Sequence, residues 1–127
     1  MARLILDTGA IIGLVRGDAR VAAALRIATE RGDEVVIPSV VVAQAIRGGP
    51  RDAPIHRLLH AVRVSFVGLR LARQAGELLG ATGMNDAVDA LVMAEALRGG
   101  PSVILTSDTA DMARLAGHRQ TVRIVQV

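Results

Sequence analysis

The sequence predicts a three-layer α/β/α fold with a central, mainly parallel sheet of about four to five strands. Short apolar runs alternate along the chain with longer segments of helical periodicity. Strands separated by helices of about ten or more residues form βαβ units, whose right-handed crossovers place helices on both faces of the sheet. Because 127 residues suffice for one core but not for two, we expect a single domain over residues 1–127.

Capping and helix-breaking residues set the boundaries expected in the first half of the chain. Asp18 and Ser39 are expected N-caps, Gly32 ends one helix, and Gly48-Gly49-Pro50 breaks another. We expect strands at 3–7, 34–37 and 64–67, and helices at 10–15, 19–31, 40–47 and 52–62.

The second half of the chain repeats this pattern. Gly80 is expected to end one helix, Asn85 to cap the next, and Gly99-Gly100-Pro101 to stop it. We expect helices at 69–79, 86–97 and 109–116, and strands at 103–105 and 122–127.

The composition excludes several kinds of site. The chain has no cysteine, which excludes disulfides, thiolate zinc sites and a cysteine nucleophile. All 15 basic residues are arginine, so no lysine is present for a P-loop or a Schiff base. Phe66 is the single aromatic residue, so base stacking on aromatic side chains is not available. The net charge of +3 permits a polyanionic partner without requiring one.

The N-terminal segment MARLILDTG contains an apolar run that is too short for a signal peptide. No stretch approaches the roughly 18 apolar residues of a membrane span. We therefore expect a cytoplasmic protein that does not enter a membrane.

Acidic residues recur where predicted strands end and predicted helices begin. Asp7 ends the first strand, and Asp108 follows the strand VILT after a hydroxyl-rich corner. Asp86 and Asp89 are spaced i, i+3 at the start of one helix, and Asp108 and Asp111 have the same spacing. In a parallel sheet with the first and fourth strands close together, these carboxylates would emerge at one edge.

These carboxylates can be interpreted in two ways, as helix caps or as metal ligands. An aspartate that opens a helix is commonly only a cap or a partner of the helix dipole. Asp89, however, lies among apolar residues, where a lone carboxylate is costly to bury. A cluster of carboxylates is unfavourable unless a cation neutralises it, and oxygen ligands favour Mg²⁺ or Mn²⁺.

Four sequence blocks give this pattern a family resemblance. LILDTGAIIGL, IPSVVVAQAIRGG, NDAVDALVMAEA and VILTSDTADMARLA together resemble the signature blocks of the PIN-domain ribonucleases, and most closely the VapC-type toxins of bacterial toxin–antitoxin pairs. The resemblance implies a metal-dependent endoribonuclease that forms a homodimer and is inhibited by a cognate antitoxin protein. It places metal-binding acidic residues at Asp7, Asp89 and Asp108, with Asp86 and Asp111 as additional candidates.

The mechanism expected from this resemblance is hydrolysis of an RNA phosphodiester by a metal-activated water. Thr8, Thr106 and Ser107 would fix the carboxylates through hydrogen bonds. Arginines on two predicted helices are candidates for RNA phosphate contacts, with a solvated helix face as the alternative. They are Arg47, Arg51, Arg57 and Arg63.

Gln44 departs from the family pattern, which usually places a glutamate at this position. An amide does not ionise and supplies at most a neutral oxygen to a catalytic site. The departure keeps open a different class of function, a catalytically weak or silent module that dimerises and engages an antitoxin.

Other readings are weaker on the sequence itself. A receiver domain lacks its strand-end lysine here, and a haloacid-dehalogenase-like phosphatase would need an aspartate where Gly9 stands. His56 and His60 have the i, i+4 spacing of a zinc pair, but no third ligand is apparent nearby.

Overall fold

The protein was examined as a computed structural model that describes residues 2–127. Its centre is a sheet of five strands in the order β3-β2-β1-β4-β5. All four strand pairings are parallel. The strands are β1 (Arg3–Leu6), β2 (Glu34–Pro38), β3 (Arg63–Ser65), β4 (Ser102–Thr106) and β5 (Val122–Gln126).

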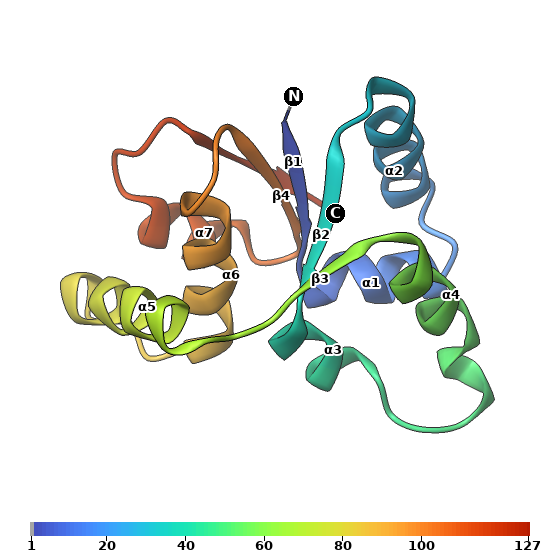
Figure 1. Cartoon of the computed structure of the whole chain (residues 1–127), viewed down its shortest axis with the longest axis horizontal. Helices are drawn as coiled ribbons and strands as arrows, with labels where there is room; N and C mark the ends of the chain where they lie inside the picture. Colours follow the sequence, from blue (N-terminus) through green and yellow to red (C-terminus); the bar gives the residue numbers. More distant parts are fainter. Residues whose placement is uncertain (1) are drawn as a thin grey trace.

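Helices cover both faces of the sheet (Figure 1). One layer contains α1 (Thr8–Val15), α2 (Ala19–Arg31), α3 (Ser39–Ala45), the short 3₁₀ turn η1 (Pro50–Asp52) and α4 (Ala53–Ala61). The opposite layer contains α5 (Leu69–Thr82), α6 (Ala87–Leu97) and α7 (Thr109–Ala116). The predicted three-layer α/β/α class with a parallel sheet is therefore confirmed.

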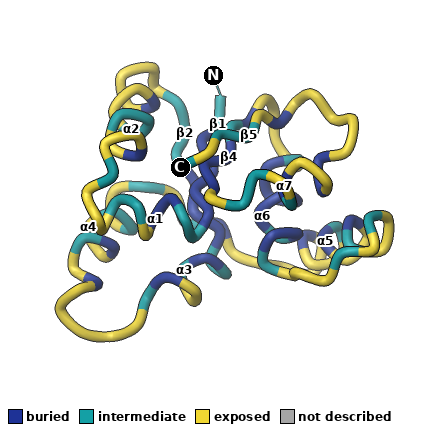
Figure 2. The backbone as a smooth tube through the Cα atoms, turned by 180° about the vertical axis from the view of Figure 1, so that it is seen from behind, coloured by how far each residue is buried: buried dark blue, intermediate teal, exposed yellow. Residues whose placement is uncertain are grey.

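The central strands and α6 carry the core (Figure 2). Ile5, Val36 and Ile104 are fully buried in three neighbouring strands. On α6, Ala90, Val92, Met93, Ala94 and Ala96 are buried, so this helix is apolar on most of its circumference. Because α6 is tightly packed on most of its circumference, it cannot rotate, and its polar side chains are held in fixed positions.

The register of β1 and β4 determines where the site lies. Leu6 pairs with Leu105, and the backbone N–H of Asp7 donates to the carbonyl of Leu105 at 3.0 Å. The expectation that the first and fourth strands lie close together is correct. Both strands end at the same edge of the sheet, where ligand sites of open α/β folds form.

Several predicted boundaries are wrong by a few residues. The first helix begins at Thr8 rather than residue 10, because the side chain of Asp7 accepts the N–H of Thr8. The helix predicted to end at Gly80 continues to Thr82 and ends where Gly83 adopts a positive φ. Asp86 rather than Asn85 caps α6, through the N–H of Asp89.

Boundary errors also occur around the third helix and the third strand. The predicted helix 40–47 is α3, which starts at Ser39 after Pro38 and stops at Ala45 because Ile46 is extended. Residues 50–52 form a 3₁₀ turn ahead of α4. The strand β3 ends at Ser65, and the next residue, Phe66, is exposed to solvent.

None of the helices in the described part of the chain is both long enough and apolar enough to cross a bilayer.

Candidate metal centre

Asp7 occupies the corner between β1 and α1. Its carboxylate accepts the N–H of Thr8 at 2.8 Å through Oδ1 and the hydroxyl of Thr106 at 2.7 Å through Oδ2. The side chain is nearly inaccessible, with 5% of the residue exposed. Asp7 is thus an N-cap, as one interpretation expected, and it is also a buried carboxylate at the functional edge of the sheet.

Thr106 connects Asp7 to the next acidic corner. Its hydroxyl donates to Asp7 and accepts the backbone N–H of Asp108 at 2.9 Å. Asp108 then lies at the N-cap position of α7, but its side chain makes no capping hydrogen bond. The carboxylate of Asp108 is therefore not engaged in capping.

The third acidic position is the start of α6. The Oδ1 atom of Asp86 accepts the N–H of Asp89 at 3.0 Å, so Asp86 acts as the cap. Asp89 is 6% exposed, and its Oδ2 has no hydrogen-bond partner, alone among the buried side-chain polar atoms of the described residues. An orphaned buried oxygen of this kind is rare in folded proteins and is a free acceptor for a ligand.

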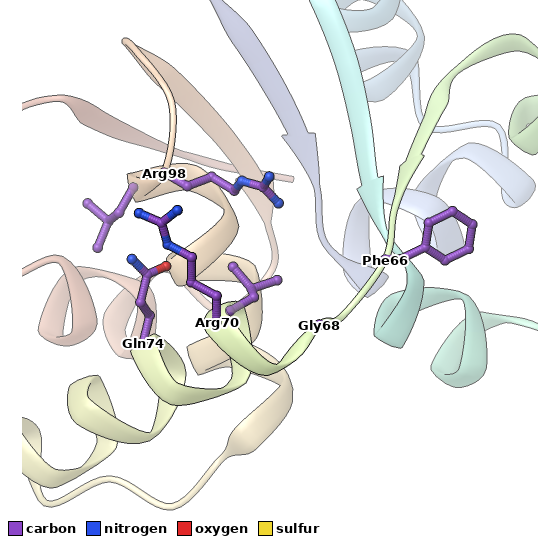
Figure 3. Close-up of a pocket in the computed structure, with 7 residues that line it drawn as sticks. Phe66, Gly68, Arg70, Gln74 and Arg98 are labelled. Carbon is purple, nitrogen blue, oxygen red and sulfur yellow. The ribbon is translucent and has the colours of Figure 1, made fainter.

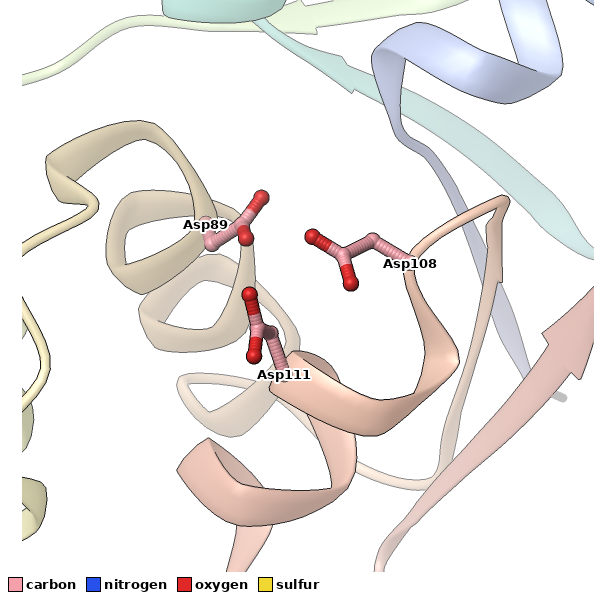
Figure 4. A group of neighbouring side chains, drawn as sticks. All are labelled: Asp89, Asp108 and Asp111. Atoms are coloured by element: carbon pink, nitrogen blue, oxygen red, sulfur yellow. The ribbon is translucent and has the colours of Figure 1, made fainter.

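Asp89, Asp108 and Asp111 point toward one another from α6 and α7 (Figure 4). Each offers a carboxylate oxygen, and these oxygens lie within 4.8 Å of one another. The trio is the one such cluster within residues 2–127. Asp111 was predicted only as an additional candidate, and the first turn of α7 brings it to Asp108 and Asp89.

Asp7 and Asp86 interact electrostatically with Asp89 of this cluster. Burial, followed by repulsion from Asp86, Asp7 and Asp108, raises the pKa of Asp89 to about 7. Burial also raises the pKa of Asp7, against the lowering effect of its hydrogen bonds with Thr106 and Thr8, and repulsion from Asp108 and Asp86 adds smaller contributions in the raising direction. Carboxylates that raise one another's pKa form a site that favours a bound cation.

The donor set fits a hard divalent cation. All the converging donors are carboxylate oxygens, and the chain has no cysteine to attract a softer metal. The unpartnered Oδ2 of Asp89 is an available ligand atom. Carboxylate sites of this kind take hard divalent cations such as Mg²⁺, Ca²⁺ and Mn²⁺.

Gln44 is brought to the edge of this site by α3. Its Oε1 accepts a hydrogen bond from the hydroxyl of Thr8, the residue after Asp7. The hydroxyl of Thr8, which was predicted to fix a carboxylate, donates to Gln44 instead, and only the backbone N–H of Thr8 binds Asp7. A neutral amide at this position leaves the cluster with one negative charge fewer than a glutamate would.

The remaining predicted residues lie in different surroundings. Ser107 is exposed, and its hydroxyl lies against Gly9. The Arg47 guanidinium donates to the carbonyls of Ala43 and Ile46. The predicted arginine and histidine residues on or near α4 are exposed. The cluster of potential metal ligands found within residues 2–127 includes neither His56 nor His60. These exposed residues are Arg51, Arg57, Arg63, His56 and His60.

A separate hollow lies between the start of α5 and the end of α6, away from the carboxylates (Figure 3). Arg70, Gln74 and Arg98 line it, and its volume is about 530 Å³. Arg98 is partly neutralised there by Glu95, at 3.2 Å. This hollow contains no acidic ligand set and is distinct from the candidate metal centre.

Sequence reasoning missed the contact that joins the two acidic corners. A Cβ atom at Gly9 would lie 2.4 Å from Oγ and 3.0 Å from the backbone N of Ser107. The absence of a side chain at Gly9 thus lets the corner after β1 touch the corner after β4. The glycine two residues after Asp7 was the available signal.

The sequence matches the PIN domain family over residues 4–118, and the chain belongs to this family. Two solved structures share its fold. One, of VapBC2 from Rickettsia felis bound to a DNA fragment from their promoter, matches with a TM-score of 0.72 and 12% identity over 98% of each chain. The other, of DNA-bound VapBC from Salmonella typhimurium, matches with a TM-score of 0.74 and 16% identity, over 99% of this chain and 98% of that one. No curated protein matches the sequence.

Proposed function

We propose that the protein is a Mg²⁺- or Mn²⁺-dependent endoribonuclease and the toxin of a type II toxin–antitoxin pair. The observation that carries this proposal is the convergence of the buried Asp89, whose pKa is raised, with the carboxylates of Asp108 and Asp111 at one edge of a PIN-domain sheet. PIN domains are generally nucleases. The likeness of the fold to VapBC structures supports the toxin assignment.

The aspartates of the site have different proposed roles. Asp89, Asp108 and Asp111 supply oxygens at distances suited to one ion. Asp7 lies outside this trio, with both carboxylate oxygens accepting hydrogen bonds, and acts on Asp89 through its charge. Thr106 holds Asp7 and Asp108 in register through its hydroxyl. Asp86 anchors the first turn of α6 and adds negative charge at the more exposed side. Gln44 would orient a water or substrate oxygen as a neutral group.

A divalent ion bound here would lower the pKa of a water molecule and neutralise charge on the phosphodiester. The carboxylates would orient the attacking water by accepting its hydrogen bonds. Arg51 and Arg57 remain proposed phosphate contacts, and Arg47 would need to leave the carbonyls that it now contacts.

The proposed partners are an RNA substrate, a cognate antitoxin and a second copy of the chain, within a single-domain cytoplasmic protein. The alternative function is a silent module that dimerises and engages the antitoxin without cleavage. Gln44 is the residue that favours this alternative, because the cluster lacks one carboxylate that the family usually has.

An RNA digest separates the two functions. Purified protein should cleave a mixed RNA substrate with Mg²⁺ or Mn²⁺ and lose activity in EDTA. Asp7→Asn, Asp89→Asn and Asp108→Asn should each reduce cleavage to the level seen in EDTA while the circular dichroism spectrum stays unchanged. Glu77→Gln, on the exposed face of α5, is the matched control and should retain full activity.

Absence of both metal binding and cleavage in the wild-type protein would favour the silent module. Full activity of a folded Asp89→Asn variant would reject the proposed site.

A further inference from the structure

A groove of about 570 Å³ adjoins the contact between Gly9 and Ser107, and none of the clustered aspartates lines it. Gly9 and Ser107 line it; Gly9 follows Asp7 by two positions, and Ser107 immediately precedes Asp108. The groove therefore begins at the contact between the two acidic corners. It continues along α1 to the turn between α1 and α2.

Three of the residues that line this groove are glycines. Gly9, Gly13 and Gly17 all line it, and their spacing of four residues places them along one face of the chain. Gly17 has a φ of +78°, which turns the chain from α1 into α2. The N–H of Asp18 then donates to the carbonyl of Gly13 at 2.8 Å, which fixes this turn. The side chains of Ile12, Arg16 and Arg20 line the groove beside these glycines, so a strand lying in it would contact both backbone and arginine side chains.

The groove carries one uncompensated positive charge. Arg20 is neutralised by Asp18, whose carboxylate accepts from Nε at 3.2 Å and from Nη2 at 2.9 Å. The Arg20 guanidinium and backbone hold the pKa of Asp18 below its usual value, so Asp18 stays ionised. Arg16 is exposed at the end of α1, and within residues 2–127 its guanidinium makes neither an ion pair nor a hydrogen bond.

We infer that this groove binds the backbone of the RNA strand next to the scissile phosphate, with Arg16 as the phosphate contact. The inference rests on the proposed ribonuclease function. A strand held at the carboxylates must leave the site past one of its rims, and the acidic cluster repels its neighbouring phosphates. A guanidinium beyond the rim offsets this repulsion and matches the geometry of a phosphate.

The continuity of the groove with the acidic corners favours RNA over an acidic peptide. Gly9, two residues after Asp7, and Ser107, next to Asp108, line one end of the groove, so an RNA strand that leaves the carboxylates past this corner would enter it. Contacts of this kind position the strand without reading its bases. We therefore expect Arg16 to set the position of the RNA strand in the groove and not to select its base sequence.

The test measures the salt dependence of RNA affinity by fluorescence anisotropy. The probe is a fluorescein-labelled phosphorothioate oligoribonucleotide of mixed sequence, which resists hydrolysis, in Mg²⁺ buffer. Arg16→Gln should reduce the slope of log affinity against log salt by about 0.7, the value for one phosphate contact on a single strand. Arg16→Lys should retain the slope, because it keeps the charge.

Arg31→Gln is the matched control. Arg31 is exposed at the far end of α2, about 16 Å of helix beyond Arg20, and does not line the groove. It should retain the wild-type slope. Unfolding temperature and Mn²⁺ affinity should be equal to wild type in all three variants.

Two results would overturn the inference while leaving the ribonuclease in place. One is a wild-type slope for Arg16→Gln in a protein that still cleaves RNA. The other is a wild-type slope together with loss of inhibition by the antitoxin, which would assign the groove to that partner. A wild-type protein that neither binds nor cleaves RNA in Mg²⁺ would instead reject the proposed function itself.

Discussion

Asp89 lies in the first turn of α6, whose other buried residues are apolar except for Glu95, and its Oδ2 is buried without a hydrogen-bond partner in the described chain. An unpaired buried polar atom costs about 1–3 kcal/mol, and more when it is charged. In the metal-free protein this cost opposes folding. A bound cation would relieve it and would then contribute to stability.

Gly9 sets the distance between the two acidic corners, so adding one methyl group there tests the site directly. Gly9→Ala would place Cβ 2.8 Å from Cβ of Ser107 and 3.0 Å from its backbone N, which forces the corner before Asp108 to move. We expect Mg²⁺ affinity to fall by roughly tenfold or more, the effect usual for groups that orient metal ligands. Isothermal titration calorimetry measures this change.

Gly80→Ala provides the control for Gly9→Ala. Gly80 lies within α5, and a Cβ atom there would have open space around it. It should stabilise the protein by about 0.5–1 kcal/mol, through helix propensity alone, with unchanged Mg²⁺ affinity. Equal effects of the two substitutions would show that the contact between the corners does not position the ligands.

At the residue scale, the sequence identified the acidic positions because each follows a strand or opens a helix. Asp7 and Asp108 could be paired once the first and fourth strands were placed together. The grouping of Asp111 with Asp89 could not be predicted, because it depends on how α7 packs against α6. The contact of Gly9 with Ser107 depends in the same way on spatial register, which a single sequence does not contain.

At the scale of elements, α6 is fixed at both ends by carboxylates. Asp86 caps its start, and Glu95 near its end is fully buried. Glu95 pairs with Arg3 of β1 and accepts the hydroxyl of Ser65 at 2.7 Å and a hydrogen bond from Arg98 at 3.2 Å. This network joins the helix that carries Asp89 to β1 and β3.

Removing Glu95 should therefore destabilise the fold. Glu95→Ala leaves the mostly buried guanidinium of Arg3 without its main partner and opens a cavity in the core. Breaking a buried ion pair in this way costs about 3–5 kcal/mol. Urea denaturation measures the free energy of unfolding. Glu77→Ala, on the exposed face of α5, should change it by less than about 0.5 kcal/mol.

A loss below about 1 kcal/mol in Glu95→Ala would show that the network contributes little to holding α6. Equal losses in Glu95→Ala and Glu77→Ala would lead to the same conclusion.

The order and type of the helices and strands could be predicted from hydrophobic periodicity, but the residues at which they end could not. Gly80 read as a stop signal, yet the helix continues because Leu78 remains buried against the core on the same turn. Phe66 and Val67 have strong strand propensity, yet β3 ends at Ser65 and Phe66 lies in solvent. In both places tertiary packing determined the boundary over local preference.

For the whole molecule, the cluster links folding stability to pH and to metal. The pKa of Asp89 is raised to about 7 in the folded protein, against an ordinary value near 4. Between about pH 4 and pH 7 the folded state therefore holds a proton that the unfolded chain has released. The free energy of unfolding must then fall as pH rises through this window in EDTA, and Asp7 contributes in the same direction.

Mg²⁺ should oppose this trend, because it binds the ionised carboxylates and not the protonated ones. At a concentration of 100 times its Kd, a ligand of the folded state adds about 2.7 kcal/mol, and 1 kcal/mol corresponds to roughly 4 °C in a domain of this size. We expect Mg²⁺ to raise the Tm by several degrees at pH 8 and by much less at pH 5. Asp89→Asn should raise the Tm in EDTA at pH 8, since it removes a repelling charge, and should abolish most of the Mg²⁺ effect. A Tm in EDTA that rises from pH 5 to pH 8, or an equal Mg²⁺ effect at both pH values, would contradict the linkage and with it the metal centre.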